Sequence, residues 1–337
     1  MRATILYGAG DVRVEDRDMP TIQEPTDAII KLSAACVCGS DLWVYRGEPF
    51  GELPTAMGHE YVGIVQEVGS AVTSVKPGDF VVGSFVASDN TCEICQAGYQ
   101  SHCPHQQQPG GSQAEFMRVP LADGTLVATA EMPSADKVPS LLAASDVLGT
   151  GWFAAKAAEV GPGKTVVVVG DGAVGLLGIL AAKQLGAERI IAMSRHEPRQ
   201  KLAREFGATD IVEERGDAGV AKIKELTGGL GAHSTIEAVG SEESLKQAIQ
   251  STRPGGHVGY VGIAHGDLNG LSLFFSGVHL HGGPAPVREY LPELIELIMT
   301  GQIEPGKVFD LEVSLDDVAE GYKAMDERRA IKTLLRV

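Results

Sequence analysis

A short run of glycines in the middle of the chain restricts its possible folds more than any other feature. Gly170, Gly172 and Gly175 follow the β-branched run 166–169 and open the apolar stretch 174–185. Such a run is typical of a buried parallel strand, and the G-x-G-x-x-G spacing permits a tight turn whose backbone approaches a pyrophosphate at a helix N-terminus. The sequence therefore predicts a unit that binds a dinucleotide through Gly170, Gly172, Ala173, Val174 and Gly175.

Strands and helices continue to alternate after this turn. Apolar segments predict further strands at 190–193, 210–212, 235–239 and 257–261, with helical stretches between them. This order is typical of a doubly wound parallel sheet, and therefore of the α/β class.

The first part of the chain has a different character. Residues 1 to about 143 are rich in Gly and Pro and contain short apolar runs at 28–32, 61–68 and 80–86, separated by turn signals. This pattern predicts an all-β, barrel-like domain. A chain of 337 residues is long enough for two such domains.

Charge and hydropathy exclude several classes of protein. With 28 basic and 44 acidic residues the net charge is −16, which repels nucleic acid and anionic membranes. No run approaches the roughly 18 apolar residues of a membrane span, and the N-terminus lacks the apolar core of a signal peptide, so we expect a cytoplasmic enzyme. The five cysteines, three of them within 92–103, favour thiolate ligands over a disulfide framework.

Cys38, in C-G-S-D, and His59, in G-H-E, together suggest two ligands of a zinc ion. Thiolate sulfur and imidazole nitrogen suit Zn²⁺, but a catalytic site needs a third protein ligand and one open position. The candidates for the third ligand are Glu60, Asp146 and Cys36. Cys36 is predicted to be a core residue, because alternate positions of one strand rarely reach the same ion.

These residues lie in motifs that span most of the chain. The segment G-H-E-Y-V-G at 58–63, with Gly69 and Val72, resembles the zinc signature of the medium-chain alcohol dehydrogenases, within the medium-chain dehydrogenase/reductase superfamily. Further matches lie at 77–79, 146–151 and 170–175 and at the C-terminus. The resemblance implies a GroES-like β-barrel catalytic domain at 1–143 and 288–337, and a Rossmann domain at 144–287.

The resemblance also implies that the C-terminal segment returns to complete the first domain. In that segment the sequence predicts a helix at 290–299, a strand near 309–313 and a helix at 314–325.

The same resemblance suggests roles around the catalytic zinc. Asp146 stands about where liver-type relatives have a ligating cysteine, and we expect it to be the third ligand. Glu60 resembles an acid that approaches the zinc transiently during ligand exchange; the alternative is a structural acid paired with a neighbouring base. Asp41 either accepts a hydrogen bond from the non-ligating nitrogen of His59 or caps a following helix.

Ser40 is expected to pass the proton of the substrate alcohol. Many relatives continue this relay with a histidine three positions later, where this chain has Trp43. The proton is then expected to leave through the cofactor ribose and water. Trp43 and Phe85 are expected to narrow the substrate pocket, although both also fit as ordinary core aromatics.

A second metal site is expected in the loop 89–103. Asp89, Cys92, Cys95 and Cys103 keep the spacing of a four-cysteine structural zinc site, with the first sulfur replaced by a carboxylate. The alternatives are a loop that has lost its metal, or replacement of Asp89 by His102 or His105. Oxygen in place of sulfur should make this site lose its zinc first.

The sequence also predicts which nicotinamide cofactor is bound. An NAD-binding fold places an acid about 20 residues after the glycine turn. Here Ser194 lies 19 residues after Gly175, followed by Arg195, His196 and, one helical turn later, Arg199. A hydroxyl and guanidinium groups suit a 2′-phosphate, so we expect NADP(H) to be preferred over NAD(H). By resemblance, Thr150 lies beside the nicotinamide and Gly262 near its carboxamide.

The expected activity is zinc-dependent oxidation of an alcohol, or reduction of an aldehyde or ketone, with NADP(H). A polyol or threonine-type dehydrogenase is the alternative within enzymes, and a non-catalytic NADPH-binding protein is the alternative outside them. The partner is then a small-molecule substrate, with no nucleic acid or membrane partner. The resemblance also implies a homodimer or homotetramer.

Overall fold

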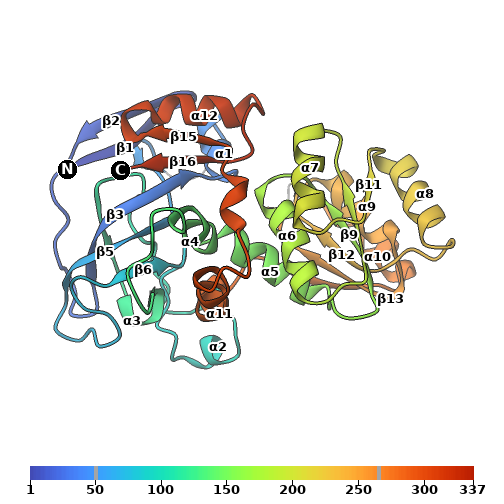
Figure 1. The fold of residues 1–337 in the computed structure, drawn as a ribbon, viewed down its shortest axis with the longest axis horizontal. Helices are drawn as coiled ribbons and strands as arrows, with labels where there is room; N and C mark the ends of the chain where they lie inside the picture. Colours follow the sequence, from blue (N-terminus) through green and yellow to red (C-terminus); the bar gives the residue numbers. More distant parts are fainter. Residues whose placement is uncertain (49–51, 264–266) are drawn as a thin grey trace. The chain divides into compact units, whose positions relative to one another are not determined.

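The computed structural model describes residues 1–48, 52–263 and 267–337, and the chain divides into two compact units (Figure 1). Unit 1 comprises Met1–Asp146 and Pro286–Val337, and unit 2 comprises Val147–Ala285. The boundaries predicted after 143 and before 288 are therefore displaced by a few residues. As a consequence, Asp146 belongs to the same unit as Cys38 and His59. Within the described residues, no helix combines the length and apolarity that a membrane crossing requires.

Unit 1 is built on a seven-stranded sheet. Its strands follow the order β15-β16-β3-β5-β6-β8, and β7 also pairs with β3. All pairings are antiparallel except that of β15 with β16. The strands are β3 (Ala28–Val37), β5 (Tyr61–Val68), β6 (Phe80–Gly83), β7 (Phe116–Val119), β8 (Leu126–Ala128), β15 (Leu311–Ser314) and β16 (Thr333–Arg336).

A smaller three-stranded sheet and several short helices complete unit 1. The small sheet has the order β2-β1-β4, with β1 (Arg2–Gly8), β2 (Asp11–Asp16) and β4 (Thr55–Ala56). The α-helices are α1 (Asp41–Tyr45), α2 (Glu93–Gln96), α3 (Ala122–Thr125), α4 (Val138–Ala144), α11 (Val287–Met299) and α12 (Val318–Asp326). The 3₁₀ turns are η1 (Gln100–His102), η2 (Pro305–Val308) and η3 (Leu315–Asp317).

The C-terminal segment returns to the first part of the chain, as the resemblance implied. β16 pairs with β3, with Thr333 opposite Val37, and β5 pairs with the other edge of β3, with Tyr61 opposite Ala35. In Figure 1 the red β15 and β16 accordingly lie beside the blue β3. The residues that precede β16 and β5 are thereby brought to the C-terminal end of β3.

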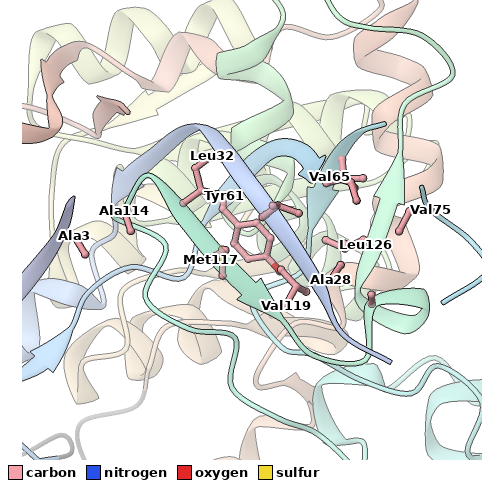
Figure 2. Close-up of a cluster of buried hydrophobic side chains, with 13 residues drawn as sticks. Ala3, Ala28, Leu32, Tyr61, Val65, Val75, Ala114, Met117, Val119 and Leu126 are labelled. Carbon is pink, nitrogen blue, oxygen red and sulfur yellow. The ribbon is translucent and has the colours of Figure 1, made fainter. Parts of the chain in front are cut away.

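The core of unit 1 lies around Tyr61 (Figure 2). Its ring is surrounded by Leu32, Met117 and Val119, and its hydroxyl donates to the carbonyl oxygen of Ser84 at 3.2 Å. A fully buried phenol needs such an acceptor, because an unpaired polar group in a dry core costs free energy. β3 is nearly buried along its whole length, which explains why its sequence is apolar rather than strictly alternating.

Unit 2 is a six-stranded parallel sheet with the order β11-β10-β9-β12-β13-β14. This is the strand order of a Rossmann fold, whose ligand sites lie beyond the carboxyl ends of the strands. The strands are β9 (Thr165–Val169), β10 (Arg189–Met193), β11 (Asp210–Val212), β12 (Ala232–Glu237), β13 (Thr252–Tyr260) and β14 (His279–Gly282). The helices are α5 (Val147–Ala157), α6 (Ala173–Gln184), α7 (Glu197–Phe206), α8 (Gly216–Leu226), α9 (Glu242–Ser251) and α10 (Gly270–Ser276).

Candidate active site and metal centres

Four side chains with metal-ligating atoms meet at the end of β3. Cys38, His59, Glu60 and Asp146 each present one such atom, and these atoms lie within 4.8 Å of one another. Cys38 follows β3, His59 and Glu60 precede β5, and Asp146 follows α4. Because β3 and β5 are antiparallel neighbours, the end of one strand lies beside the start of the other.

Gly58 is required for the turn that presents His59. Its φ is +97°, and a Cβ at this position would lie 2.5 Å from Ser112 Oγ and 2.8 Å from atoms of Gln113. Only glycine combines this backbone conformation with such close neighbours.

His59 has a carboxylate at each ring nitrogen. Nε2 lies 3.1 Å from Asp146 Oδ2, and Nδ1 lies 3.3 Å from Asp41 Oδ1. Asp41 also accepts the backbone N–H of Cys38 at 2.9 Å and Gln113 Nε2 at 3.3 Å. Asp41 therefore orients His59 and the Cys38 loop together, which answers the question that the sequence left open about its role.

Glu60 is half of a buried ion pair. Its Oε1 accepts Lys332 Nζ at 2.6 Å, with side-chain exposures of 0% and 1%. Lys332 Nζ also donates to the carbonyl oxygen of Val37 at 3.3 Å. The other oxygen, Glu60 Oε2, is buried and has no hydrogen-bond partner among the described residues. Glu60 thus has the neighbouring base that one sequence alternative required, while one of its oxygens remains able to accept a cation.

The electrostatics of this cluster favour a cation. Burial alone would lower the pKa of His59, but the negative groups of Asp41, Cys38 and Asp146 outweigh burial and raise this pKa well above its usual value. Lys332 is paired with Glu60, and the imidazole of His59 alone faces the carboxylates of Asp41 and Asp146, so the site is short of positive charge. A sulfur, a nitrogen and carboxylate oxygens, with one orphaned buried oxygen, form a donor set that fits Zn²⁺.

Of the residues expected to surround the substrate, Phe85 lies against this cluster. The ring of Phe85 meets the ring of His59 edge-on, with centroids 6.3 Å apart. Ser40 immediately precedes α1 and makes no side-chain capping bond to it. Trp43 lies on α1, where the guanidinium of Arg46 is 5.9 Å from its ring centroid. Cys36 is buried in β3 and is not among the four clustered ligands, which agrees with its interpretation as a core residue.

A second ligand cluster lies around α2. Asp89, Cys92, Cys95 and Cys103 also present atoms within 4.8 Å of one another. The sulfurs of Cys92 and Cys103 are 3.9 Å apart, close to the roughly 3.8 Å between two thiolates on one tetrahedral zinc. The donor set of three thiols and a carboxylate therefore fits a closed structural zinc site.

The two histidines beside this second ligand cluster have other hydrogen-bond partners. His105 Nδ1 lies 2.6 Å from Asp89 Oδ2, and His102 Nδ1 lies 3.2 Å from Ser101 Oγ. Asp89 Oδ1 also accepts the backbone N–H of Cys92 at 3.1 Å. Asp89 is therefore the fourth member of the cluster that the structure assembles, and His105 orients its carboxylate.

The glycine turn has the backbone that a bound pyrophosphate needs. Gly170 has a φ of +117°, and a Cβ on Gly175 would lie 2.0 Å from the carbonyl oxygen of Gly170. A Cβ on Gly172 would meet no atom within 4 Å, so open space lies in front of the N-terminus of α6. Gly172 is the N-cap residue of α6, so no side chain of that residue caps the helix. The turn therefore fits a dinucleotide.

Beyond the glycine turn, Ser194 follows β10 and is buried, whereas Arg195 and His196 are exposed. Arg199, on α7, has a side chain that is 15% exposed. Ser194 Oγ donates to Asp171 Oδ2 at 2.7 Å, and Arg199 Nη1 lies 3.3 Å from Asp171 Oδ1.

The two residues assigned to the nicotinamide by resemblance lie elsewhere in unit 2. Thr150 is buried on α5. Gly262 follows β13, and a Cβ there would lie 2.1 Å from the backbone nitrogen of Gly240.

Family comparisons agree with this geometry. Residues 24–131 match the alcohol dehydrogenase GroES-like domain, and residues 173–300 match the zinc-binding dehydrogenase domain. Zinc-type alcohol dehydrogenase B of Aspergillus flavus is 33% identical over 351 residues, covering 100% of this chain and 81% of that protein. The chain belongs to the zinc-binding alcohol dehydrogenases.

Two further relatives extend this alcohol dehydrogenase match. A probable zinc-binding alcohol dehydrogenase of Mycobacterium tuberculosis is 36% identical, covering 96% of this chain and 84% of that protein. The structure of alcohol dehydrogenase TADH from Thermus sp. ATN1 superimposes with a TM-score of 0.91 at 30% identity, covering 100% of both chains. The chain is thus a zinc-type alcohol dehydrogenase that uses a nicotinamide cofactor.

The sequence did not indicate three residues that contact the predicted site residues of the two units. Lys332 pairs with Glu60, Gln113 holds Asp41, and Asp171 contacts Ser194. Lys332 lies just before β16, and no local pattern around it pointed to a buried partner. By contrast, an acid between the first two glycines of the turn was a usable signal. Gln113 lies in a stretch with no distinctive pattern, so nothing in the sequence pointed to it.

Proposed function

We propose that this alcohol dehydrogenase holds its catalytic zinc with Cys38, His59 and Asp146, and that it prefers NADP(H). The observation that carries the ligand set is the 3.1 Å between His59 Nε2 and Asp146 Oδ2. Two ligands of one tetrahedral zinc at nitrogen and oxygen distances lie roughly 3.3 Å apart. Glu60 Oε1 is 4.0 Å from the same nitrogen and is held by Lys332, which supports Asp146 as the ligand and Glu60 as its neighbour.

Charge balance supports the same set. The Cys38 thiolate and the Asp146 carboxylate contribute two negative charges, and neutral His59 contributes none. The two negative charges of the ligands balance the two positive charges of a zinc ion. The negative charge of the ligands therefore does not exceed that of the ion, which can still polarise a bound oxygen.

The residues around the site are proposed to have separate roles in the reaction. When bound, zinc polarises an alcohol or carbonyl oxygen, and the nicotinamide exchanges a hydride with the adjacent carbon. Ser40 is proposed to relay the hydroxyl proton of the alcohol: it gives its own hydroxyl proton toward the ribose and water as it accepts the proton of the substrate, and the reverse reaction runs the same transfer backwards. Asp41 fixes the ring of His59 through Nδ1. Phe85, edge-on to His59, presents an apolar wall, and Trp43 on α1 is proposed as a second wall.

The residues that follow β10 support the proposed preference for NADP(H). No acid stands at Ser194. Arg195 follows it in the chain, and the guanidinium of Arg199 contacts Asp171, which accepts the Ser194 hydroxyl. Guanidinium binds a phosphate through paired, charge-assisted hydrogen bonds, which a ribose hydroxyl does not offer. Thr150 and Gly262 are proposed to contact the nicotinamide ring and its carboxamide.

The proposal includes a homo-oligomer. Leu271, Phe274 and Phe275 on α10 are 69%, 78% and 76% exposed, and β14 is an edge strand of the parallel sheet. Exposed apolar side chains beside an open strand edge favour a contact with a second copy of the chain. Light scattering on purified protein measures this directly, and a monomer at assay concentration would contradict it.

One experiment tests the activity and the cofactor preference together. Zinc-loaded enzyme is assayed with alcohols, aldehydes and ketones, each with NADP(H) and NAD(H) in parallel. We expect turnover of apolar substrates with a higher kcat/KM for NADP(H). A preference for polyols or threonine would favour the related dehydrogenase class, and the absence of turnover with every substrate would favour a non-catalytic NADPH-binding protein.

A further inference from the structure

Asp171 occupies an unusual place in the dinucleotide-binding turn. It lies between Gly170 and Gly172, just before the N-terminus of α6, and its side chain is 17% exposed. Its carboxylate is directed to the end of the neighbouring strand, because Oδ2 accepts the hydroxyl of Ser194 at 2.7 Å. The turn therefore carries a negative charge at the point where a dinucleotide binds.

The sheet register explains this contact. β9 and β10 are parallel neighbours, with Val169 opposite Met193. The residues that follow these strands, Asp171 and Ser194, consequently emerge at the same edge of the sheet. In NAD-binding Rossmann folds an acid at the end of the second strand accepts the ribose 2′-hydroxyl. This chain lacks that acid on β10 but supplies a carboxylate to the same place from the first turn.

Asp171 also engages the cations that would bind a 2′-phosphate. Arg199 Nη1 lies 3.3 Å from Asp171 Oδ1 and 3.2 Å from its carbonyl oxygen. Burial lowers the pKa of Arg215, an effect that the charge of Asp171 opposes and that of Arg195 reinforces. The carboxylate of Asp171 thus contacts Arg199 directly and acts on the charge of Arg215.

These contacts have opposite consequences for the two cofactors. A carboxylate accepts a hydrogen bond from a free 2′-hydroxyl, whereas it repels a 2′-phosphate. The Asp171 carboxylate also accepts the hydrogen bond of the Ser194 hydroxyl and neutralises part of the charge of Arg199. A 2′-phosphate must therefore displace Asp171 from both groups before it gains their full attraction.

Given the NADP(H) binding proposed above, we propose that Asp171 is a specificity-determining residue that restrains the preference for NADP(H) and lets the site also accept NAD(H). The restraint comes from the Asp171 carboxylate itself, and its removal leaves Ser194 and the arginines available to phosphate.

Asp171→Asn tests this inference, because the amide keeps the shape of the side chain and removes its charge. Binding of 2′,5′-ADP and 5′-AMP is measured by calorimetry on the zinc-loaded enzyme, together with NADP⁺ and NAD⁺. These nucleotides report the adenosine end of the site without any need for turnover. Hydrogen bonds to charged groups are worth enough that we expect the ratio of the two dissociation constants to shift about tenfold or more toward the 2′-phosphate.

Two further variants keep the result interpretable. Glu225→Gln makes the same charge change at an exposed acid on α8, paired with Lys222, and we expect the ratio to stay unchanged. Asp171→Ser removes the carboxylate by a different route and should shift the ratio in the same direction, which covers the case in which Asp171→Asn fails to fold.

The outcomes separate this inference from the proposed function. Wild-type enzyme that binds 2′,5′-ADP, with an unchanged ratio in both Asp171 variants, overturns the role of Asp171 and leaves the NADP(H) proposal intact. Wild-type enzyme that binds neither 2′-phosphorylated probe contradicts the NADP(H) proposal. If the Asp171 variants then still bind neither, the inference is overturned as well, whereas a gain of binding in those variants supports it.

Discussion

The buried pair of Glu60 and Lys332 gives a prediction whose size follows from the structure. The two charges are 2.6 Å apart with exposures of 0% and 1%, so water screens neither of them. Burial alone would lower the pKa of Lys332, but Cys36, Glu60 and Cys38 raise this pKa well above its usual value, and the lysine stays charged. Lys332→Met keeps most of the side-chain volume and leaves Glu60 without its partner.

We expect Lys332→Met to lower the free energy of unfolding of unit 1 by about 3–5 kcal/mol, the cost of an uncompensated buried charge. The double variant Lys332→Met with Glu60→Gln removes both charges and should cost only about 1 kcal/mol, because replacing both partners of a buried pair is often nearly neutral. Glu60→Gln alone leaves Lys332 charged without its partner, so the two single costs are strongly non-additive, and the double variant should cost less than Lys332→Met alone.

Urea unfolding of chelator-treated protein measures these values in unit 1, followed by the fluorescence of Trp43 on α1 in chains that all carry Trp152→Phe, because Trp152 lies in unit 2. Zinc-loaded protein provides a second comparison. A divalent cation beside Glu60 offsets part of its charge, so the cost of Lys332→Met should be smaller when zinc is present. The reasoning is refuted if the single variant costs less than about 1 kcal/mol, or if the double variant costs as much as the two single variants together.

Three further outcomes follow from other parts of the molecule. Gly175→Ala places a Cβ 2.0 Å from the carbonyl oxygen of Gly170, so calorimetry should detect no NADP⁺ binding while the zinc content of the protein is unchanged; normal binding would contradict the turn geometry. During gradual chelation, the zinc beside Asp89 should leave before activity falls, which elemental analysis and turnover measure in the same samples; loss of activity with the first zinc would reverse this order. Arg189 beside Asp210 holds the pKa of that carboxyl at about 2, below its unfolded value of about 3.9, so the pair stabilises the fold above pH 4 and this contribution is lost as the pH falls toward 2. Asp210→Asn should therefore melt below the wild type at pH 7 and approach it at pH 3, and an equal difference at both pH values would argue against the pair.

The sequence predicted unit 2 more closely than unit 1. β11 begins and ends as predicted, and α6 lies within one residue of its predicted limits, because buried parallel strands and long apolar helices have strong local patterns. β12 was predicted to reach 239 but ends at Glu237, whose carboxylate accepts the N–H groups of Val239 and Gly240 and turns the chain.

Unit 1 depends more on contacts between distant segments. β1, β2 and β16 were not predicted. β2 is mostly polar, and β16 is a short strand placed by its pairing with β3 and β15. The same reason explains why Lys332 was missed. Its position beside Glu60 follows from the registers of β16 and β5 on the two edges of β3, and no local pattern contains that information.

The clustering of metal-ligating side chains was easier to predict, because cysteine, histidine and carboxylate in fixed spacings are chemically distinctive. Cys38, His59 and Asp146 were chosen by residue type and resemblance, and the structure brings their ligating atoms together with that of Glu60. What the sequence could not supply is the choice between two carboxylates, of which Asp146 lies 3.1 Å and Glu60 4.0 Å from His59 Nε2.

The zinc content of two variants tests that choice directly. Asp146→Asn and Glu60→Gln each remove the charge of one carboxylate and keep its shape, and elemental analysis counts the zinc ions in each purified chain. We predict one zinc per chain, without turnover, for Asp146→Asn and two zinc ions for Glu60→Gln. Two zinc ions in Asp146→Asn and one in Glu60→Gln would contradict this account and make Glu60 the third ligand.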